Sequence, residues 1–172
     1  SEQQVQALVD AALARFRRID ILVNDAAYNK WIAFNDFDAL THEVWQKIID
    51  TNLTGPMLCI KAVTAAMRKT GGGRIVNISS RGAFRGEPTK PAYGASKAGL
   101  NSLTQSLAVA LAPHKVYVAA VAPGFVNTEL TADRLSGPEG KEIKAQSPFN
   151  RVAEPEEVAR AVAVEPQRAD AH

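Results

Sequence analysis

One tyrosine and one lysine stand at a spacing that suits acid–base chemistry. Tyr93 and Lys97 lie four residues apart, so on a helix their side chains share one face. The pKa of a free tyrosine is near ~10, and a neighbouring ammonium lowers it because the ammonium favours the phenolate. General acid–base catalysis works best when that pKa approaches the working pH. The spacing alone favours an ordinary surface pair on a helix, so the chemistry depends on further residues.

A pair of serines supplies the second candidate group. Ser79-Ser80 follows an apolar run, Gly82 lies just beyond, and the segment with Tyr93 comes next. A serine hydroxyl at the end of a strand could hold a substrate oxygen beside the tyrosine. The alternative is a serine that only caps a loop.

Three short apolar segments alternate with long helical patterns. The predicted strands are Ile19–Asn24, Arg74–Ser79 and Val116–Val121, and the predicted helices between them are Thr41–Arg68 and Pro91–Leu111. Connections of this length indicate parallel crossovers, so the fold class is α/β with a doubly wound parallel sheet.

The remaining segments complete this pattern. The apolar spacing predicts helices over Gln3–Phe16 and Pro155–Val164, with a partly helical loop over Thr128–Gln146 between the last strand and the last helix. Gly71-Gly72-Gly73 is interpreted as a helix terminator. Residues 165–172 are expected to be a disordered or atypical tail.

Polar and special residues follow each predicted strand. They are Asn24, Ser79, Ser80 and Pro123-Gly124. Ligands of open parallel sheets bind beyond the carboxyl ends of the strands, so these residues are expected on one rim of the sheet.

Composition excludes several classes of function. The formal net charge of +2 is too small to suggest a nucleic-acid partner. The single cysteine, Cys59, is interpreted as a small buried hydrophobe on a helix. His42, His114 and His172 show no metal-ligand spacing. The two tryptophans, Trp31 and Trp45, are interpreted as packing residues.

Targeting signals are absent from the sequence. No apolar run approaches the roughly 20 residues that cross a bilayer, and the polar opening segment does not resemble a signal peptide. We therefore expect no membrane partner and a reducing, cytoplasmic location. The chain does not begin with Met, which suggests a fragment or a processed product.

Together, the motifs resemble those of the short-chain dehydrogenases/reductases. They fall in the order of that family and cover most of the chain. The matching stretches are Asn24-Asp25-Ala26-Ala27, Thr51-Asn52-Leu53, the strand that delivers Ser80, the pair Tyr93 and Lys97, and Pro123-Gly124-Phe125-Val126-Asn127-Thr128.

The resemblance implies a catalytic role for four residues. Tyr93 would exchange a proton with the oxygen of an alcohol or carbonyl substrate. Lys97 would lower the pKa of Tyr93 and bind the nicotinamide ribose. Ser80 would orient the substrate oxygen, and Asn52 would hold a water that connects Lys97 to solvent. The expected activity is the NAD- or NADP-dependent interconversion of a small-molecule alcohol and carbonyl.

The resemblance also implies the contacts of the cofactor. Asn24 and Ala26 would lie under it, Tyr93 and Lys97 would contact it, and Pro123, Gly124 and Thr128 would lie at its nicotinamide end. The sequence does not distinguish NAD from NADP.

The sequence departs from the family pattern in two ways. Asp25 and Ala27 replace an Asn and a Gly of the first motif. The Gly-rich turn that holds the pyrophosphate at a helix N-terminus is absent, and Gly71-Gly72-Gly73 precedes a strand and so does not replace it. We therefore expect residues 1–172 to form one incomplete Rossmann-like domain that lacks the first three strands, leaves the strand at Ile19–Asn24 as an exposed edge, and binds nicotinamide cofactors very weakly by itself.

Two alternatives remain open. Without the phosphate-binding turn, the chain could be a catalytically inactive binding or scaffold fragment. Non-redox chemistry on this fold, as in the halohydrin dehalogenases, is disfavoured because those proteins resemble this family but carry Arg at the position of Lys97.

The resemblance further implies a homo-oligomer that packs through the helices Thr41–Arg68 and Pro91–Leu111. Substrate choice would lie in the segments Arg81–Lys90 and Glu129–Pro148, whose charge pattern names no substrate.

Overall fold

The centre of the molecule is a parallel sheet of three strands. The computed structural model describes residues 1–33 and 35–168. In this part of the chain the strands β1 (Ile21–Asn24), β2 (Gly73–Ile78) and β3 (Val116–Val121) pair in the order β1-β2-β3. The predicted α/β class and parallel sheet are therefore confirmed. Strand β1 is an edge strand, also as predicted, and Ile21 is 53% exposed.

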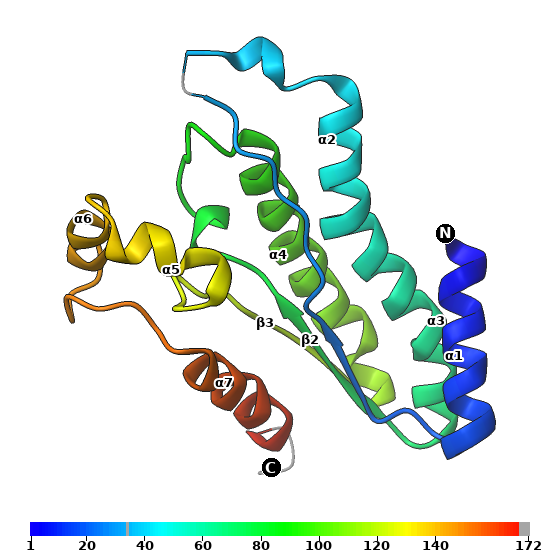
Figure 1. The fold of residues 1–172 in the computed structure, drawn as a ribbon. Coiled ribbons are helices and arrows are strands. Elements are labelled where there is room, and N and C mark those ends of the chain that lie inside the picture. The colour runs from blue at the N-terminus through cyan, green and yellow to red at the C-terminus, as the bar shows by residue number, and fades with distance from the viewer. Residues whose placement is uncertain (34, 169–172) are drawn as a thin grey trace.

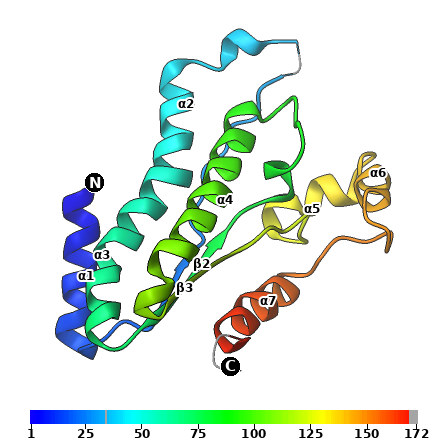
Figure 2. The same cartoon turned by 180° about the vertical axis from the view of Figure 1, so that it is seen from behind.

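Long helices cover one face of this sheet. They are α1 (Glu2–Phe16), α3 (Gly55–Lys69) and α4 (Pro91–Leu111), and α7 (Pro155–Arg168) lies against the other face (Figures 1 and 2). The main core lies between the sheet and the first three helices, where Ile60, Met67 and Ile75 are buried. Burying each such side chain contributes roughly 1.5–3 kcal/mol. This packing fixes the positions of the strand ends and of the α4 N-terminus.

The predicted helix Thr41–Arg68 is not one regular α-helix. It consists of α2 (His42–Ile49), a π-helical turn η2 (Asp50–Thr54) and α3. Pro56 has no N–H to donate to the carbonyl of Asn52, as an α-helix would require. Instead, the N–H of Gly55 donates to the carbonyl of Asp50, five residues earlier. π-turns inside α-helices often mark functional sites, and this one contains Asn52.

The glycine run ends α3, as predicted. Gly71 and Gly72 adopt φ of 92° and 136°, which L-residues rarely adopt. The N–H of Gly72 donates to the carbonyl of Met67 at 2.9 Å. A Cβ on Gly72 would overlap the carbonyl of Lys115, so this turn also brings the chain close to the start of β3.

Two short helices follow β3, in agreement with the predicted partly helical loop. They are α5 (Glu129–Ser136) and α6 (Gly140–Ala145). Three 3₁₀ turns complete the elements of the described chain: η1 (Phe37–Ala39), η3 (Arg81–Ala83) and η4 (Ala112–His114). No helix among the described residues has the length and hydropathy that a membrane span requires.

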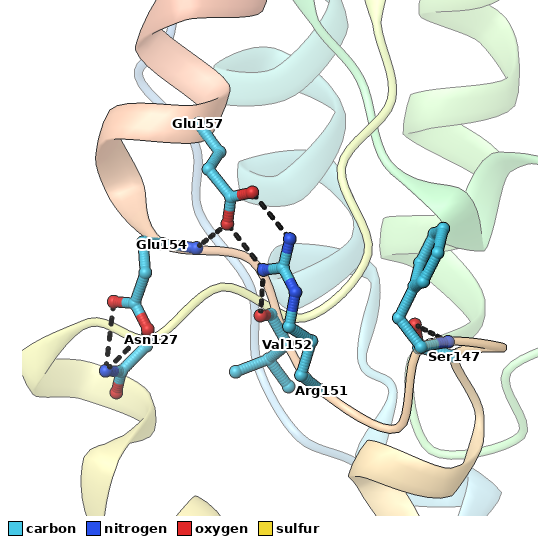
Figure 3. Close-up of polar contacts among 7 residues, drawn as sticks. Asn127, Ser147, Arg151, Val152, Glu154 and Glu157 are labelled. Atoms are coloured by element: carbon cyan, nitrogen blue, oxygen red, sulfur yellow. Dashed lines mark hydrogen bonds and ion pairs between the residues drawn. The ribbon is translucent and has the colours of Figure 1, made fainter.

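A cluster of polar contacts fixes the start of α7 (Figure 3). The guanidinium of Arg151 donates to both carboxylate oxygens of Glu157, at 2.6 and 2.7 Å, and the N–H of Glu154 donates to the same carboxylate at 2.9 Å. The Arg151 hydrogen bonds, followed by the one from Glu154, lower the pKa of Glu157 to about 2. Helix α7 reaches Arg168 and so extends past its predicted end at Val164, and residues 169–172 of the predicted tail lie outside the described part of the chain.

Candidate active site

Tyr93 and Ser80 line a common cavity of ≈ 710 Å³ at the carboxyl end of the sheet. Ser80 lies directly after β2, where its hydroxyl accepts a hydrogen bond from the N–H of Gly82 and caps η3. Tyr93 lies in the first turn of α4. Ser79, in contrast, is 3% exposed, and its hydroxyl donates to the carbonyl of Lys97. The geometry therefore distinguishes Ser80 from its neighbour as the serine that lines the cavity.

The phenol of Tyr93 is largely buried. Burial raises the pKa of Tyr93, and a hydrogen bond with Ser80 opposes this shift. The direction is opposite to the one that its spacing from Lys97 predicts. The Lys97 Nζ lies 5.7 Å from the centre of the Tyr93 ring and donates to the carbonyl of Ile78 at 2.6 Å. Desolvation, helped by the negative charge of Glu87, outweighs the Ser80 hydrogen bond, so the environment of the phenol favours its protonated form.

Lys97 is almost completely buried behind Tyr93, at 2% exposure. Burial lowers the pKa of Lys97, and the nearby carboxylate of Asp25 opposes that shift. An ammonium has three N–H groups, and the carbonyl of Ile78 is its one hydrogen-bond partner among the described residues. Lys97 therefore has N–H groups that make no hydrogen bond within the described part of the chain. Asp25, a departure from the family pattern, favours the charged form of this lysine.

Asn52 is fully buried, and its side chain connects two segments. Its Oδ1 accepts from the N–H of Tyr28 at 2.7 Å, and its Nδ2 donates to the carbonyl of Tyr28 at 2.9 Å and to Ser96 Oγ at 3.0 Å. Ser96 Oγ in turn donates to the carbonyl of Tyr93 at 2.7 Å. Both donors of the amide are used in these contacts. The side chain of Asn52 thus positions Tyr28 and α4, while its predicted role as the holder of a water next to Lys97 stays a prediction.

Asn24 also has a partner inside the fold. Its Nδ2 donates to Asn77 Oδ1 at 2.8 Å, and Asn77 donates to Thr104 Oγ1 at 2.9 Å. This buried chain of hydrogen bonds joins the ends of β1 and β2 to α4. Ala26 is exposed just beyond β1. Neither Asn24 nor Ala26 lines the cavity, although the adjacent Ala27 does.

Three of the predicted cofactor residues lie on the wall that faces Tyr93. Pro123, Gly124 and Thr128 line the cavity, and Thr128 caps the N-terminus of α5. These residues fit the nicotinamide end of a dinucleotide, whereas Lys97 lies behind Tyr93 at 2% exposure and does not itself line the cavity. No Gly-rich turn connects a strand to a helix among the described residues, so the fit does not extend to the pyrophosphate.

Several residues of the cavity carry no signal in the sequence. Arg81, Lys90 and Arg134 line it together with Trp31 and Phe125. Trp31 is 49% exposed, so its interpretation as a packing residue is wrong. The three cations come from three separate segments, and no local charge run announces them. No group of three His, Cys, Asp or Glu able to hold a metal ion occurs in the described part of the chain.

Comparison with known proteins assigns the family. The family model described as enoyl-(acyl carrier protein) reductase matches residues 1–164. The chain is 40% identical over 156 residues to a 3-oxoacyl-[acyl-carrier-protein] reductase of Synechocystis sp., a match that covers 91% of this chain and 60% of the relative. It is 38% identical to human dehydrogenase/reductase SDR family member 4, covering 90% of this chain and 55% of that protein. The chain therefore spans less than two thirds of the length of these curated relatives.

Solved structures agree with this assignment. An NAD⁺-bound xylitol dehydrogenase superposes with a TM-score of 0.85 at 27% identity, covering 95% of this chain and 68% of that one. A gluconate 5-dehydrogenase of Burkholderia cenocepacia, in complex with NADP and tartrate, gives a TM-score of 0.86 at 28% identity and covers 94% of this chain and 63% of that one. The sheet is thus part of a Rossmann-type fold, and the chain belongs to the short-chain dehydrogenase/reductase family.

Proposed function

We propose that this chain supplies the catalytic residues of an NAD- or NADP-dependent oxidoreductase that interconverts an alcohol and a carbonyl. The observation that carries the proposal is the placement of the Tyr93 phenol and the Ser80 hydroxyl on one cavity wall, with the Lys97 ammonium buried behind them. The relatives named above are dehydrogenases and reductases, which supports the same reaction class.

The proton in this reaction would come from Tyr93. A bound nicotinamide cofactor would supply the hydride for the carbonyl carbon. Burial raises the pKa of Tyr93 and so favours the protonated phenol, which would donate its proton to the carbonyl oxygen and leave an alcohol and a phenolate. The Ser80 hydroxyl would donate a hydrogen bond to the same oxygen. In oxidation the phenolate would take the proton back from the alcohol.

Lys97 would act on Tyr93 itself and on the ribose of the cofactor. Its ammonium, near the ring, stabilises the phenolate that forms when the proton leaves, and its remaining N–H groups would bind the ribose hydroxyls. The contact of Lys97 with the carbonyl of Ile78 fixes this geometry before any ligand binds. Asn52 supports the arrangement through Ser96 and the carbonyl of Tyr93.

Replacement of Tyr93 by phenylalanine tests the proposal. In the natural protein that carries this chain, Tyr93→Phe should reduce turnover of a carbonyl substrate by at least about 100-fold, the usual contribution of a positioned acid. Cofactor binding should remain within about twofold, because the ring is kept. Oxidation of NADH or NADPH is followed at 340 nm. Tyr117→Phe is the matched control, since Tyr117 lies on β3 and is exposed. Unchanged turnover in Tyr93→Phe would refute the assignment.

We further propose that the protein forms a homo-oligomer through the outer surfaces of α3 and α4. Met57 on α3 and Val109 on α4 are exposed apolar residues on these helices, and Val109 is 78% exposed. A mass of one chain in multi-angle light scattering at micromolar concentration would contradict this proposal.

A further inference from the structure

The cavity beside Tyr93 contains more positive than negative charge. Arg81 in η3, Lys90 at the N-cap of α4 and Arg134 in α5 all line it, and Glu87 is the one carboxylate on its wall among the described residues. Burying like charges together is costly without counter-charges. The excess positive charge must therefore be neutralised by partners elsewhere in the fold or by a bound anion.

Among the described residues, only one of the three cations has a carboxylate partner on the cavity wall. Lys90, whose side chain is 19% exposed, lies a long 3.9 Å from Glu87. Arg134 pairs with Glu139 at 2.6 Å, but that carboxylate is 59% exposed and does not line the cavity. Arg81 donates to the neutral side chain of Gln146 at 2.8 Å, and no carboxylate among the described residues forms an ion pair with it. Its Nε is buried without a hydrogen-bond partner in that same part of the chain.

Two aromatic rings hold the cations in place. The guanidinium of Arg134 lies 4.5 Å from the centre of the Trp31 ring, and Lys90 Nζ lies 5.5 Å from it. The guanidinium of Arg81 lies 5.6 Å from the Phe125 ring centre. Contacts between cations and ring faces are attractive, yet they leave the positive charge uncompensated. The rings therefore fix the cations in advance and add apolar surface for the body of a ligand.

The backbone supports this wall. The N–H of Ile32, next to Trp31, donates to the carbonyl of Thr89, next to Lys90, at 2.9 Å, and Ile32 is buried. Burial lowers the pKa of Lys90, and the charges of Arg134 and Arg81 lower it further, while Glu87 opposes the shift. The cations thus repel one another in a wall that the fold keeps rigid, and a bound anion would relieve that repulsion.

We propose that this cavity binds substrates with a carboxylate, which Arg81, Lys90 and Arg134 hold while the carbonyl or hydroxyl carbon faces Tyr93 and Ser80. The substrate class is then oxo acids and the corresponding hydroxy acids, with the carbon skeleton against Trp31 and Phe125. This inference rests on the proposed function, because it takes the same cavity as the site of the reaction. The volume of ≈ 710 Å³ lies within the range of small-molecule sites.

A pair of ligands that differ only in charge tests the proposal without a cofactor or turnover. The probes are 4-oxopentanoate and its neutral isostere 4-oxopentanamide. With Trp45→Phe, Trp31 is the one remaining tryptophan, and its fluorescence reports binding in the cavity. The carboxylate should bind at least tenfold more tightly than the amide, and this preference should shrink as salt is added. Calorimetry with the native chain checks the affinities.

Single substitutions then assign the preference to the cations. Lys90→Gln and Arg134→Gln should each weaken 4-oxopentanoate binding at least fivefold and leave the amide unchanged. Arg15→Gln is the matched control, because Arg15 lies over the ring of Phe16 on α1, outside the cavity.

Equal affinity for the two probes in the native chain would overturn the proposal, even if a variant failed to fold. The proposal would also fail if both variants kept the full preference for the carboxylate. Tyr93→Phe should retain that preference. The binding result is therefore distinguishable from the turnover result, and a failure of either proposal can be recognised separately.

Discussion

Asn52→Ala should destabilise the fold by about 3 kcal/mol. The side chain of Asn52 is 0% exposed and makes three hydrogen bonds, two with the main chain of Tyr28 and one with Ser96. Each buried hydrogen bond contributes about 1 kcal/mol net. Alanine cannot replace these bonds, and the small gain in helix propensity, about 0.5 kcal/mol, offsets little of the loss. The unfolding midpoint should fall by about 6–12 °C in a domain of this size.

The assay is urea unfolding followed by circular dichroism at 222 nm, with thermal unfolding as a second measurement. Asn101→Ala is a matched control, because it makes the same substitution in α4. The Nδ2 of Asn101 is buried without a hydrogen-bond partner among the described residues. Removing an unsatisfied donor from a helix should leave the stability unchanged or raise it by up to about 1 kcal/mol. The difference between the two variants then isolates the hydrogen bonds of Asn52.

A loss below about 1 kcal/mol in Asn52→Ala, or a loss equal to that in Asn101→Ala, would refute this reasoning. Asn52→Ala should also change the fluorescence of Trp31, since the segment after Tyr28 carries that ring. If the variant is destabilised and the emission of Trp31 is unchanged, Asn52 stabilises the helices but does not position the segment that carries Trp31.

Two further predictions concern the ends of helices. The carboxylate of Glu157 has its pKa lowered to about 2 from an ordinary value of 4.5, so its stabilising effect is fully present above pH 4.5 and is lost as the pH falls from 4.5 through 2. Glu157→Gln should therefore reduce the urea midpoint clearly at pH 6 and much less at pH 2.5, with Glu156→Gln as the control for charge. A pH-independent difference would contradict the assignment. Gly72→Ala should lower the free energy of unfolding by about 3 kcal/mol, because Gly72 has a φ of 136° and a Cβ there would overlap the carbonyl of Lys115. Gly71→Ala should lower it by only about 1 kcal/mol, because no atom lies near the position of the added Cβ. Equal losses for the two variants in urea unfolding would show that the close approach to Lys115 does not matter.

Regular periodicity made much of the fold predictable. The helix Pro91–Leu111 and the strand Val116–Val121 have the predicted boundaries, because apolar spacing, Pro91 and the glycine after Pro123 all favour the same limits. The break at η2 could not be predicted from periodicity, since the apolar pattern continues through it. Its local signal was Gly55-Pro56, which removes one α-helical donor, but the choice of a π-turn depends on the contacts of Asn52 with Tyr28 and Ser96.

The candidate site residues can be predicted from the sequence because their motifs are local, whereas the pKa shifts of their side chains cannot. The four-residue spacing of Tyr93 and Lys97 gives their common face, but the pKa of each depends on how deeply it is buried. Burial raises the pKa of the tyrosine and lowers that of the lysine, and no pattern along the chain encodes the depth of a side chain. The cationic wall was missed for a related reason. Arg81, Lys90 and Arg134 are ordinary surface residues in sequence and become a cluster only when η3, α4 and α5 meet at one cavity.

The hydrogen bonds of Asn52 connect the proposed proton donor to the proposed anion-binding wall. Through Ser96 they hold the α4 turn that carries Tyr93, and through Tyr28 they hold the segment that carries Trp31. The same residue therefore supports both Tyr93 and the Trp31 side of the cavity. Substitution of Lys90 should act on carboxylate binding alone, because Lys90 contacts Trp31 without taking part in that network. Substitution of Asn52 should weaken both the preference for a carboxylate and the turnover, because the segment from Tyr28 to Trp31 and α4 would lose the same hydrogen-bonded support.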